Sequence, residues 1–253
     1  MINKFKLILF AVFFIYQNLA FSKTNDNKDF NPRYLSNYLS AIILQDNNDS
    51  IKYFKNFSKI NNVYLLLGSI PITENYKLFN RSILINPDGD IISIYDKIHM
   101  FDITLKNGES YKESDFYSPG SELKITKVLG HSVGHTICYD LRYPKLYRTL
   151  AKKGSQIIVV PSAFTHTTGK AHWHSLIKAR AIENGVFILA PNQWGVNNEK
   201  RATYGHTLIV DPWGQTLAEA EDGEMIIAAE LDLNRVRECQ NAIPVLDNDR
   251  NFD

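Results

Sequence analysis

Apolar residues recur in short runs after residue 50, and polar or turn-forming residues separate the runs. Helical spacing of the apolar positions predicts a helix over Ser50–Ile60, and a continuous apolar run predicts a buried strand over Val63–Leu67. The Pro-Asp-Gly turn at 87–90 predicts a hairpin between strands Arg81–Asn86 and Ile91–Tyr95. This part of the chain therefore combines a helix with antiparallel strands.

The rest of the chain continues the alternation after a long loop over Thr104–Gly120, a length that is usually functional or mobile. The strands expected there are Val133–Cys138, Gln156–Val160, Val186–Ala190, Thr207–Val210, Thr216–Ala218 and Met225–Leu231. The expected helices are Tyr143–Lys153, Ala171–Asn184 and Asn234–Ala242. Alternating strands and helices with interposed hairpins indicate a mixed α/β sheet domain.

The N-terminus has a different pattern. Lys4 and Lys6 precede the apolar run Leu7–Tyr16, and a polar stretch follows from Lys23. A basic start, a short apolar run and a small-residue end are typical of a secretory signal, so we expect residues 1–22 to direct export and 23–253 to form a single domain. The alternative is that Lys6–Ile15 is a buried strand of a cytoplasmic protein.

Composition excludes several functions. The chain has 253 residues and a formal net charge of +1, so it lacks the basic excess of a nucleic-acid-binding protein. Its two cysteines, Cys138 and Cys239, form no metal-ligand motif. His172 and His174 are two positions apart in a predicted helix and therefore point to different faces, which argues against a metal site.

Cys138 is the most informative residue for chemistry. A β-branched run ends at this cysteine, and Tyr139, Asp140 and Arg142 follow it before Pro144. This pattern predicts a strand that delivers a thiol to a sharp strand-to-helix corner, beside backbone N–H groups able to hold an oxyanion. The alternative is an inert cysteine in the core.

Several other side chains stand at positions from which they can reach such a thiol. Lys97 ends the predicted hairpin, and Glu113 lies in the long loop. Arg142 either supports the corner or contacts a substrate carboxylate, and Asn192 follows a strand end where it can line a pocket. A less favoured mechanism pairs Cys138 with a histidine.

Eight short motifs, in order along the chain, resemble those of one family. They are Tyr-Asp-Lys-Ile-His-Met-Phe-Asp (95–102), Lys-Glu-Ser-Asp with Ser-Pro-Gly (112–120), Ile-Cys-Tyr-Asp-Leu-Arg-Tyr-Pro (137–144), Pro-Ser-Ala-Phe (161–164), Gly-Lys-Ala-His-Trp (169–173), Ala-Arg-Ala-Ile-Glu-Asn (179–184), Tyr-Gly-His-Thr (204–207) and Asp-Pro-Trp-Gly (211–214). The chain thus resembles the nitrilase superfamily of carbon–nitrogen hydrolases, closest to the branch of omega-amidase and deaminated-glutathione amidase.

The resemblance implies an α-β-β-α sandwich with mixed sheets, doubled in a homodimer. It implies that Cys138 is the nucleophile, Lys97 the catalytic lysine and Glu113 a second glutamate. The thiolate would attack a small linear amide, and Lys97 with the Tyr139 N–H would stabilise the oxyanion. Water would then hydrolyse the acyl-thioester, with neither a metal nor an organic cofactor.

The chain departs from the family pattern at its N-terminus. The family's first glutamate, which serves as general base in a Pro-Glu pair after an apolar strand, has no counterpart here, so the first βα unit is missing or replaced. The nearest local match puts the glutamate position near Lys28. Three alternatives follow: Asp26 or Asp29 replaces that base, Glu113 assumes its role, or the chain is an impaired relative that serves as an interaction module.

Overall fold

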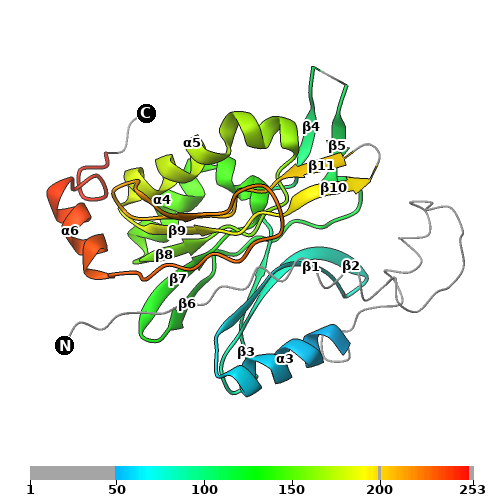
Figure 1. Ribbon diagram of the computed structural model, residues 1–253, viewed down its shortest axis with the longest axis horizontal. Helices are drawn as coiled ribbons and strands as arrows, with labels where there is room; N and C mark the ends of the chain where they lie inside the picture. The colour runs from blue at the N-terminus through cyan, green and yellow to red at the C-terminus, as the bar shows by residue number, and fades with distance from the viewer. Residues whose placement is uncertain (1–48, 107, 199–200, 251–253) are drawn as a thin grey trace, which may run out of the picture. The chain divides into compact units, whose positions relative to one another are not determined.

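The computed structural model describes residues 49–106, 108–198 and 201–250 (Figure 1). These residues form two compact units that meet in sequence between Ser121 and Glu122, and each is described by itself. The signal-like segment 1–22 and the missing or replaced βα unit lie outside the described residues and stay predictions, as does the single domain 23–253.

The first unit is a three-stranded antiparallel sheet with a helix packed on it (Figure 1). Helix α3 spans Asp49–Asn61, and the strands are β1 (Leu65–Glu74), β2 (Lys77–Ile85) and β3 (Ile91–Asp96). The helix and both strands of the β2–β3 hairpin are confirmed. Apolar side chains of the helix and of β1 and β2 form one core: Ile51, Phe54, Leu65, Leu67, Ile72, Ile83 and Ile85.

Strand β1 runs past the apolar segment that predicted it, to Glu74. The pairing of β1 with β2 shifts register between Leu67 and Ile70. Beyond the shift the two strands stay paired as far as Glu74 and Lys77, next to the turn that joins them. The guanidinium of Arg81 on β2, which is 3% exposed, donates to both carboxylate oxygens of Asp96 and to Glu74. These bonds fix the end of β3, from which Lys97 follows.

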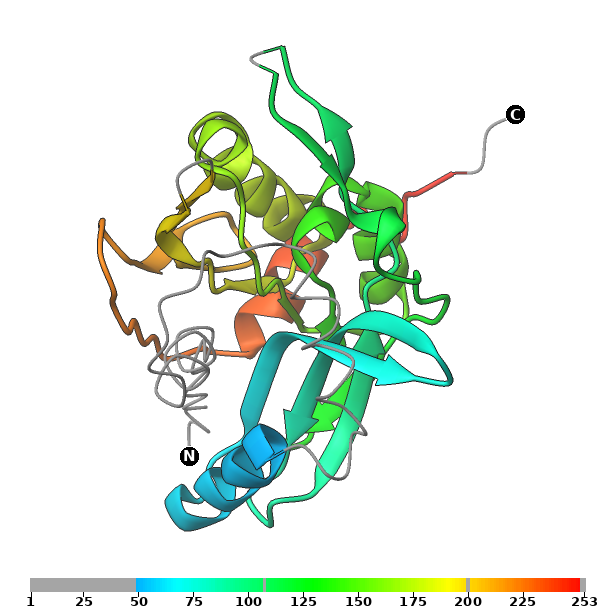
Figure 2. The ribbon, with the colours of Figure 1, turned by 90° about the vertical axis from the view of Figure 1, so that its right-hand side faces the viewer.

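The expected loop over 104–120 is only partly a loop. It contains a second hairpin of β4 (Asp102–Thr104) and β5 (Ser110–Lys112), followed by a short 3₁₀ helix, η2 (Glu113–Asp115). Figure 2 shows this hairpin extending away from the β1–β3 sheet. Strands of three residues are too short to show an alternating pattern, so periodicity missed them.

The second unit is built on a six-stranded mixed sheet in the order β13-β12-β9-β8-β7-β6. Strands β7, β8 and β9 are parallel, and the outer pairs are antiparallel. The strands are β6 (Ile125–Val128), β7 (His131–His135), β8 (Ile157–Val159), β9 (Phe187–Ala190), β12 (Leu208–Val210) and β13 (Thr216–Glu219). β10 (Trp194–Asn198) and β11 (Arg201–Tyr204) form a separate ribbon.

The helices of this unit are α4 (Pro144–Lys152), α5 (His166–Asn184) and α6 (Asn234–Ala242), and α4 and α5 lie together over the sheet (Figure 1). Helix α5 starts five residues before the expected Ala171 because Thr165 caps it, accepting from Thr168 N at 3.4 Å. It ends at Gly185, whose φ of +60° suits glycine.

Most expected strands of this unit are confirmed, but two differences stand out. The sequence showed no signal for β6, β10 or β11. The strand expected over Met225–Leu231 is wrong: within the part of the chain that the structure describes, only Leu231 of this segment forms a β-bridge, and Met225 and Ile226 are 49% and 72% exposed.

Taken together, the described elements confirm the mixed α/β class. Within the ranges that the structure describes, no helix is both long and apolar enough to cross a bilayer.

His135, at the end of β7, is a buried histidine with few polar contacts among the described residues. The residue is 1% exposed; Nε2 lies 3.2 Å from Thr126 Oγ1, and Nδ1 has no hydrogen-bond partner among the described residues. Burial, assisted by the charge of Lys124, lowers the pKa of His135 from 6.5 to about 4. The folded protein therefore holds this ring neutral at pH values where the unfolded chain would protonate it.

This difference predicts a pH-dependent loss of stability. The unfolded chain takes up the proton first, so the contribution of His135 is fully present above pH 6.5 and is lost as the pH falls towards about 4, by about 3 kcal/mol in total. Urea titrations at several pH values measure this loss. His135→Leu should flatten the dependence in that window, whereas His131→Gln, a partly exposed histidine of the same strand, should leave it unchanged.

Candidate active site

Cys138 lies at the expected corner. Strand β7 ends at His135, and the short 3₁₀ helix η3 (Cys138–Arg142) begins at the cysteine itself. Its φ of +48° is in the left-handed region, which a non-glycine residue occupies only when its surroundings hold it there. Among the described residues Cys138 is a free cysteine, and it is partly exposed instead of sealed in the core.

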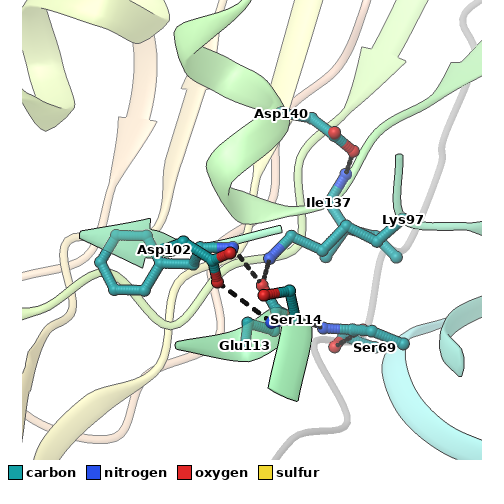
Figure 3. Close-up of polar contacts among 9 residues, drawn as sticks. Ser69, Lys97, Asp102, Glu113, Ser114, Ile137 and Asp140 are labelled. Atoms are coloured by element: carbon teal, nitrogen blue, oxygen red, sulfur yellow. Dashed lines mark hydrogen bonds and ion pairs between the residues drawn. The ribbon is translucent and has the colours of Figure 1, made fainter. Parts of the chain in front are cut away.

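Contacts on both sides of the corner keep it in place. The Cys138 N–H donates to the Pro161 carbonyl at 3.0 Å. The fully buried carboxylate of Asp140 accepts from the Ile137 N–H at 2.9 Å, which Figure 3 shows. Arg180 on α5 donates from Nε to the Leu141 carbonyl at 3.0 Å. The strained turn is thus tied to its own strand, to the loop after β8 and to α5.

Asp140 and Arg180 differ in how far sequence could anticipate them. Sequence places Asp140 two residues after the thiol, and its buried carboxylate supports the corner. Arg180 and Glu183, three positions apart on α5, form an ion pair at 2.8 Å. The second bond of Arg180, to Leu141, joins residues 39 positions apart, and no local pattern signals such a contact.

Arg142 closes η3 and places a cation beside the thiol. Its guanidinium stacks over the Phe164 ring at 5.4 Å, and Nη1 lies 3.3 Å from His172 Nδ1. Burial has the largest effect and lowers the pKa of Arg142, while the charges of Tyr139 and Cys138 act in the opposite direction. A half-buried guanidinium is suited to bind a carboxylate.

Tyr139 and Asn192 occupy different settings. The Tyr139 ring packs edge-on against Tyr143 at 5.5 Å and is partly exposed. The Asn192 amide is buried, accepts from Phe164 N at 3.0 Å and donates to the Gly205 carbonyl at 2.6 Å. Asn192 therefore links three loops, and the roles of both residues in substrate or oxyanion binding stay predictions.

Lys97 is held at the end of β3 in the first unit. Its N–H donates to the Asn80 carbonyl at 2.9 Å, its carbonyl accepts from Gly120 N at 2.8 Å, and the residue is 2% exposed. A Cβ on Gly120 would lie 2.3 Å from the Asp96 carbonyl oxygen, so only glycine allows this close approach. The glycine of the Ser-Pro-Gly motif therefore allows the hydrogen bond that holds the Lys97 backbone.

The Lys97 ammonium forms a buried ion pair with Glu113 Oε2, drawn in Figure 3. The same oxygen accepts from the Phe101 N–H at 2.7 Å, and Oε1 accepts from Asn80 Nδ2 at 3.0 Å. Asn80 in turn accepts from Ser69 Oγ at 2.5 Å. The expected proximity of Lys97 and Glu113 is confirmed, and Asn80 and Ser69 are supporting residues that no motif revealed.

The candidate residues thus fall into two groups. Lys97 and Glu113 are in contact in the first unit; Cys138, Tyr139 and Arg142 share η3 in the second, with Asn192 elsewhere in that unit. The approach of Lys97 to Cys138 stays a prediction.

A mixed α/β scaffold that presents a thiol at a strand-to-helix corner, with a buried lysine–glutamate pair, defines the class as a candidate thiol-dependent hydrolase. The family model for carbon–nitrogen hydrolases matches residues 7–241, and the chain belongs to this family.

Similar proteins are consistent with this family assignment. The chain is 38% identical over 192 residues to a deaminated glutathione amidase of Yersinia enterocolitica, covering 74% of this chain and 67% of that protein. It is 34% identical over 217 residues to the omega-amidase NIT2 of Mus musculus, covering 86% and 79%. A third relative is the nitrilase and fragile histidine triad fusion protein NitFhit of Drosophila melanogaster, 38% identical over 201 residues and 78% of this chain, of which the chain spans only 43%.

Solved structures confirm the fold. The crystal structure of the C. elegans NitFhit protein matches with a TM-score of 0.80 at 32% identity, covering 89% of this chain and 55% of that one. The resemblance to the nitrilase superfamily is therefore confirmed, and by family the chain is an amidase-type hydrolase of carbon–nitrogen bonds.

The role of Asp140 in holding the corner is testable by truncation. Asp140→Ala removes the acceptor of a buried N–H, so we expect the free energy of unfolding to fall by about 1–3 kcal/mol. Urea denaturation measures it. Asp90→Ala, at an exposed turn, should stay within about 0.5 kcal/mol of the parent. An equal loss in both variants would show that Asp140 has no special role.

Proposed function

We propose that the protein hydrolyses a small linear amide through a thioester on Cys138. The observation that carries this proposal is the partly exposed thiol at a left-handed corner, beside the Arg142 cation. A core cysteine needs no such strained backbone, and strain of this kind concentrates at functional sites.

In the proposed reaction, the Cys138 thiolate attacks the amide carbonyl carbon and forms a carbon–sulfur bond. The carbonyl electrons move to oxygen, where the Lys97 ammonium and the Tyr139 N–H stabilise the oxyanion. The intermediate collapses with cleavage of the carbon–nitrogen bond, and the amine nitrogen leaves as ammonia after gaining a proton from the general acid. Water then attacks the thioester, releasing the carboxylic acid and the thiol.

Glu113 is better suited to position Lys97 than to exchange protons. Its two oxygens already accept three hydrogen bonds, from Lys97, Asn80 and the Phe101 N–H. A base needs a lone pair directed at the reacting proton. We therefore assign the general base to a carboxylate outside the described residues, with Asp29 as the first candidate and Asp26 as the second.

For the substrate, we propose a small amide that also carries a free carboxylate. Two of the relatives are named deaminated glutathione amidase and omega-amidase, and Arg142 offers a guanidinium on the same short helix as the thiol. Bidentate binding by that guanidinium would orient the far end of the amide.

The proposal predicts a trapped acyl-enzyme. With 2-oxoglutaramate, mass spectrometry of rapidly quenched protein should show an acyl adduct on the peptide that contains Cys138, with release of ammonia. Cys138→Ser should lose the adduct and at least about 10³-fold in kcat. Cys239→Ser, at the other cysteine, serves as the matched control and should retain both. An adduct on any other residue would contradict the mechanism.

A catalytically impaired protein that serves as an interaction module is the second candidate, and one observation favours it. The family match begins at residue 7, within the apolar run Leu7–Phe10, yet residues 1–25 contain no Asp or Glu. The position that best matches the family's first glutamate is near Lys28, where the chain carries a cation instead of a carboxylate.

Two variants separate the candidates. If Asp29 is the base, Asp29→Asn should lower kcat by about 10²–10⁴-fold in an ammonia-release assay. Asp49→Asn, at the exposed start of α3, is its control. If the protein is impaired, the parent shows no turnover and Lys28→Glu, at the position that best matches the family's glutamate, restores it. A gain in Lys28→Glu together with an unaffected Asp29→Asn would refute Asp29 as base.

We also propose export through residues 1–22 and a homodimeric assembly, the first from the signal-like pattern and the second from the family resemblance. Cytoplasmic location remains the alternative. An intact Met1 in natively produced protein would argue against export, and a monomer mass by light scattering would argue against the dimer.

A further inference from the structure

His174, His206 and Glu219 form a cluster that the proposed amide hydrolysis does not use. One possible ligand atom from each of these residues lies within 4.8 Å of the other two. They come from three separate places in the second unit: helix α5, the connection between β11 and β12, and strand β13. We propose that they bind a divalent transition-metal ion of the zinc type.

The distances suit such an ion. His174 Nε2 lies 2.7 Å and His206 Nδ1 lies 3.5 Å from Glu219 Oε1. In a tetrahedral zinc site with bonds near 2.0–2.1 Å, neighbouring ligand atoms are about 3.3 Å apart. Binding of an ion therefore requires His174 Nε2 and Glu219 Oε1 to move slightly apart. Both imidazoles now converge on one carboxylate oxygen, and a cation between them would give each nitrogen its own bond.

A carboxylate also lies near the second ring nitrogen of His206. With Nδ1 directed at Glu219, its Nε2 lies 3.7 Å from Asp222 Oδ1. Ligand histidines usually direct their second ring nitrogen to a carboxylate or carbonyl, which fixes the ring and increases its basicity. This arrangement is independent of the three-residue cluster and points to the same use.

The backbone holds His206 in this orientation. Its φ is +56°, in the left-handed region, and its carbonyl accepts from the buried Trp173 Nε1 at 2.8 Å. The Tyr204 ring lies 4.3 Å from the His206 ring and 6.0 Å from that of His174. The two histidines are therefore fixed before any ion arrives, which reduces the entropy lost on binding.

Exposure indicates how the ion would reach the site and what completes its shell. The side chains of His174, His206 and Glu219 are 33%, 24% and 37% exposed, so the site opens to solvent. Three protein ligands leave one position, which water would occupy. Two imidazoles and one carboxylate favour zinc over magnesium or calcium, which take mainly oxygen ligands.

Zinc titration against a competing chelating dye tests the proposal directly. In a Cys138→Ala background, which removes the reactive thiol as a rival ligand, we expect one Zn²⁺ per chain that excess Mg²⁺ does not displace. His206→Gln and Glu219→Gln should each weaken binding by more than about 100-fold, and Asp222→Asn by about 10-fold. His172→Gln, two positions from His174 on the same helix, should bind as the parent does.

A thermal-unfolding series shows that the variants are folded. Metal that binds only the native state raises Tm, so Zn²⁺ should raise the Tm of the parent and of His172→Gln but not that of Glu219→Gln. Near-equal unfolding temperatures of all variants in chelator exclude misfolding as the cause. Absence of saturable zinc binding in the Cys138→Ala background, or binding unaffected by both Glu219→Gln and His206→Gln, would overturn the proposal.

Discussion

The buried ion pair between Lys97 and Glu113 holds the candidate catalytic lysine of the first unit in place. An ammonium that is almost fully buried is tolerated only with a charged partner and a full set of hydrogen bonds. Removing one partner of such a pair typically destabilises a protein by about 3–5 kcal/mol. Glu113 meets the requirement because Asn80 and the Phe101 N–H hold its carboxylate. The pair therefore joins the end of β3 to the β4–β5 hairpin and fixes the direction of the ammonium.

In the second unit, Cys138 is held in a left-handed backbone conformation that a non-glycine residue disfavours. The left-handed φ of Cys138 persists because Asp140, Arg180 and the Pro161 carbonyl determine the chain on either side of it. Two of these contacts come from parts of the chain distant in sequence. The sheet and α5 thus act as the support of the thiol, and the loops at the strand ends are left to shape a binding site.

Sequence predicted those features that have a local signature. The helix α3, the β2–β3 hairpin, the thiol corner and α6 followed from periodicity, turn residues and the strand that ends at Cys138. Sequence missed short strands and strands outside the main sheet: β4 and β5 have three residues each, and β10 and β11 form a separate two-stranded ribbon. Met225–Leu231 shows the reverse error, because an apolar composition alone does not make a strand. At the site, motifs identified Lys97, Glu113 and Cys138, but not Asn80 or the bond from Arg180 to Leu141, since both depend on tertiary contacts.

The central proposal is that the Lys97 ammonium lies beside the Cys138 sulfur and makes it more reactive. The rate of Cys138 alkylation by iodoacetamide at neutral pH measures this directly, with mass spectrometry assigning the modified peptide. The double variant Lys97→Met/Glu113→Gln removes both charges of the buried pair together, and Lys112→Met removes an exposed lysine nearby in sequence as the control. The account predicts that the double variant alkylates at least about tenfold more slowly, while Lys112→Met reacts as the parent does. Equal rates in the parent and the double variant would contradict it.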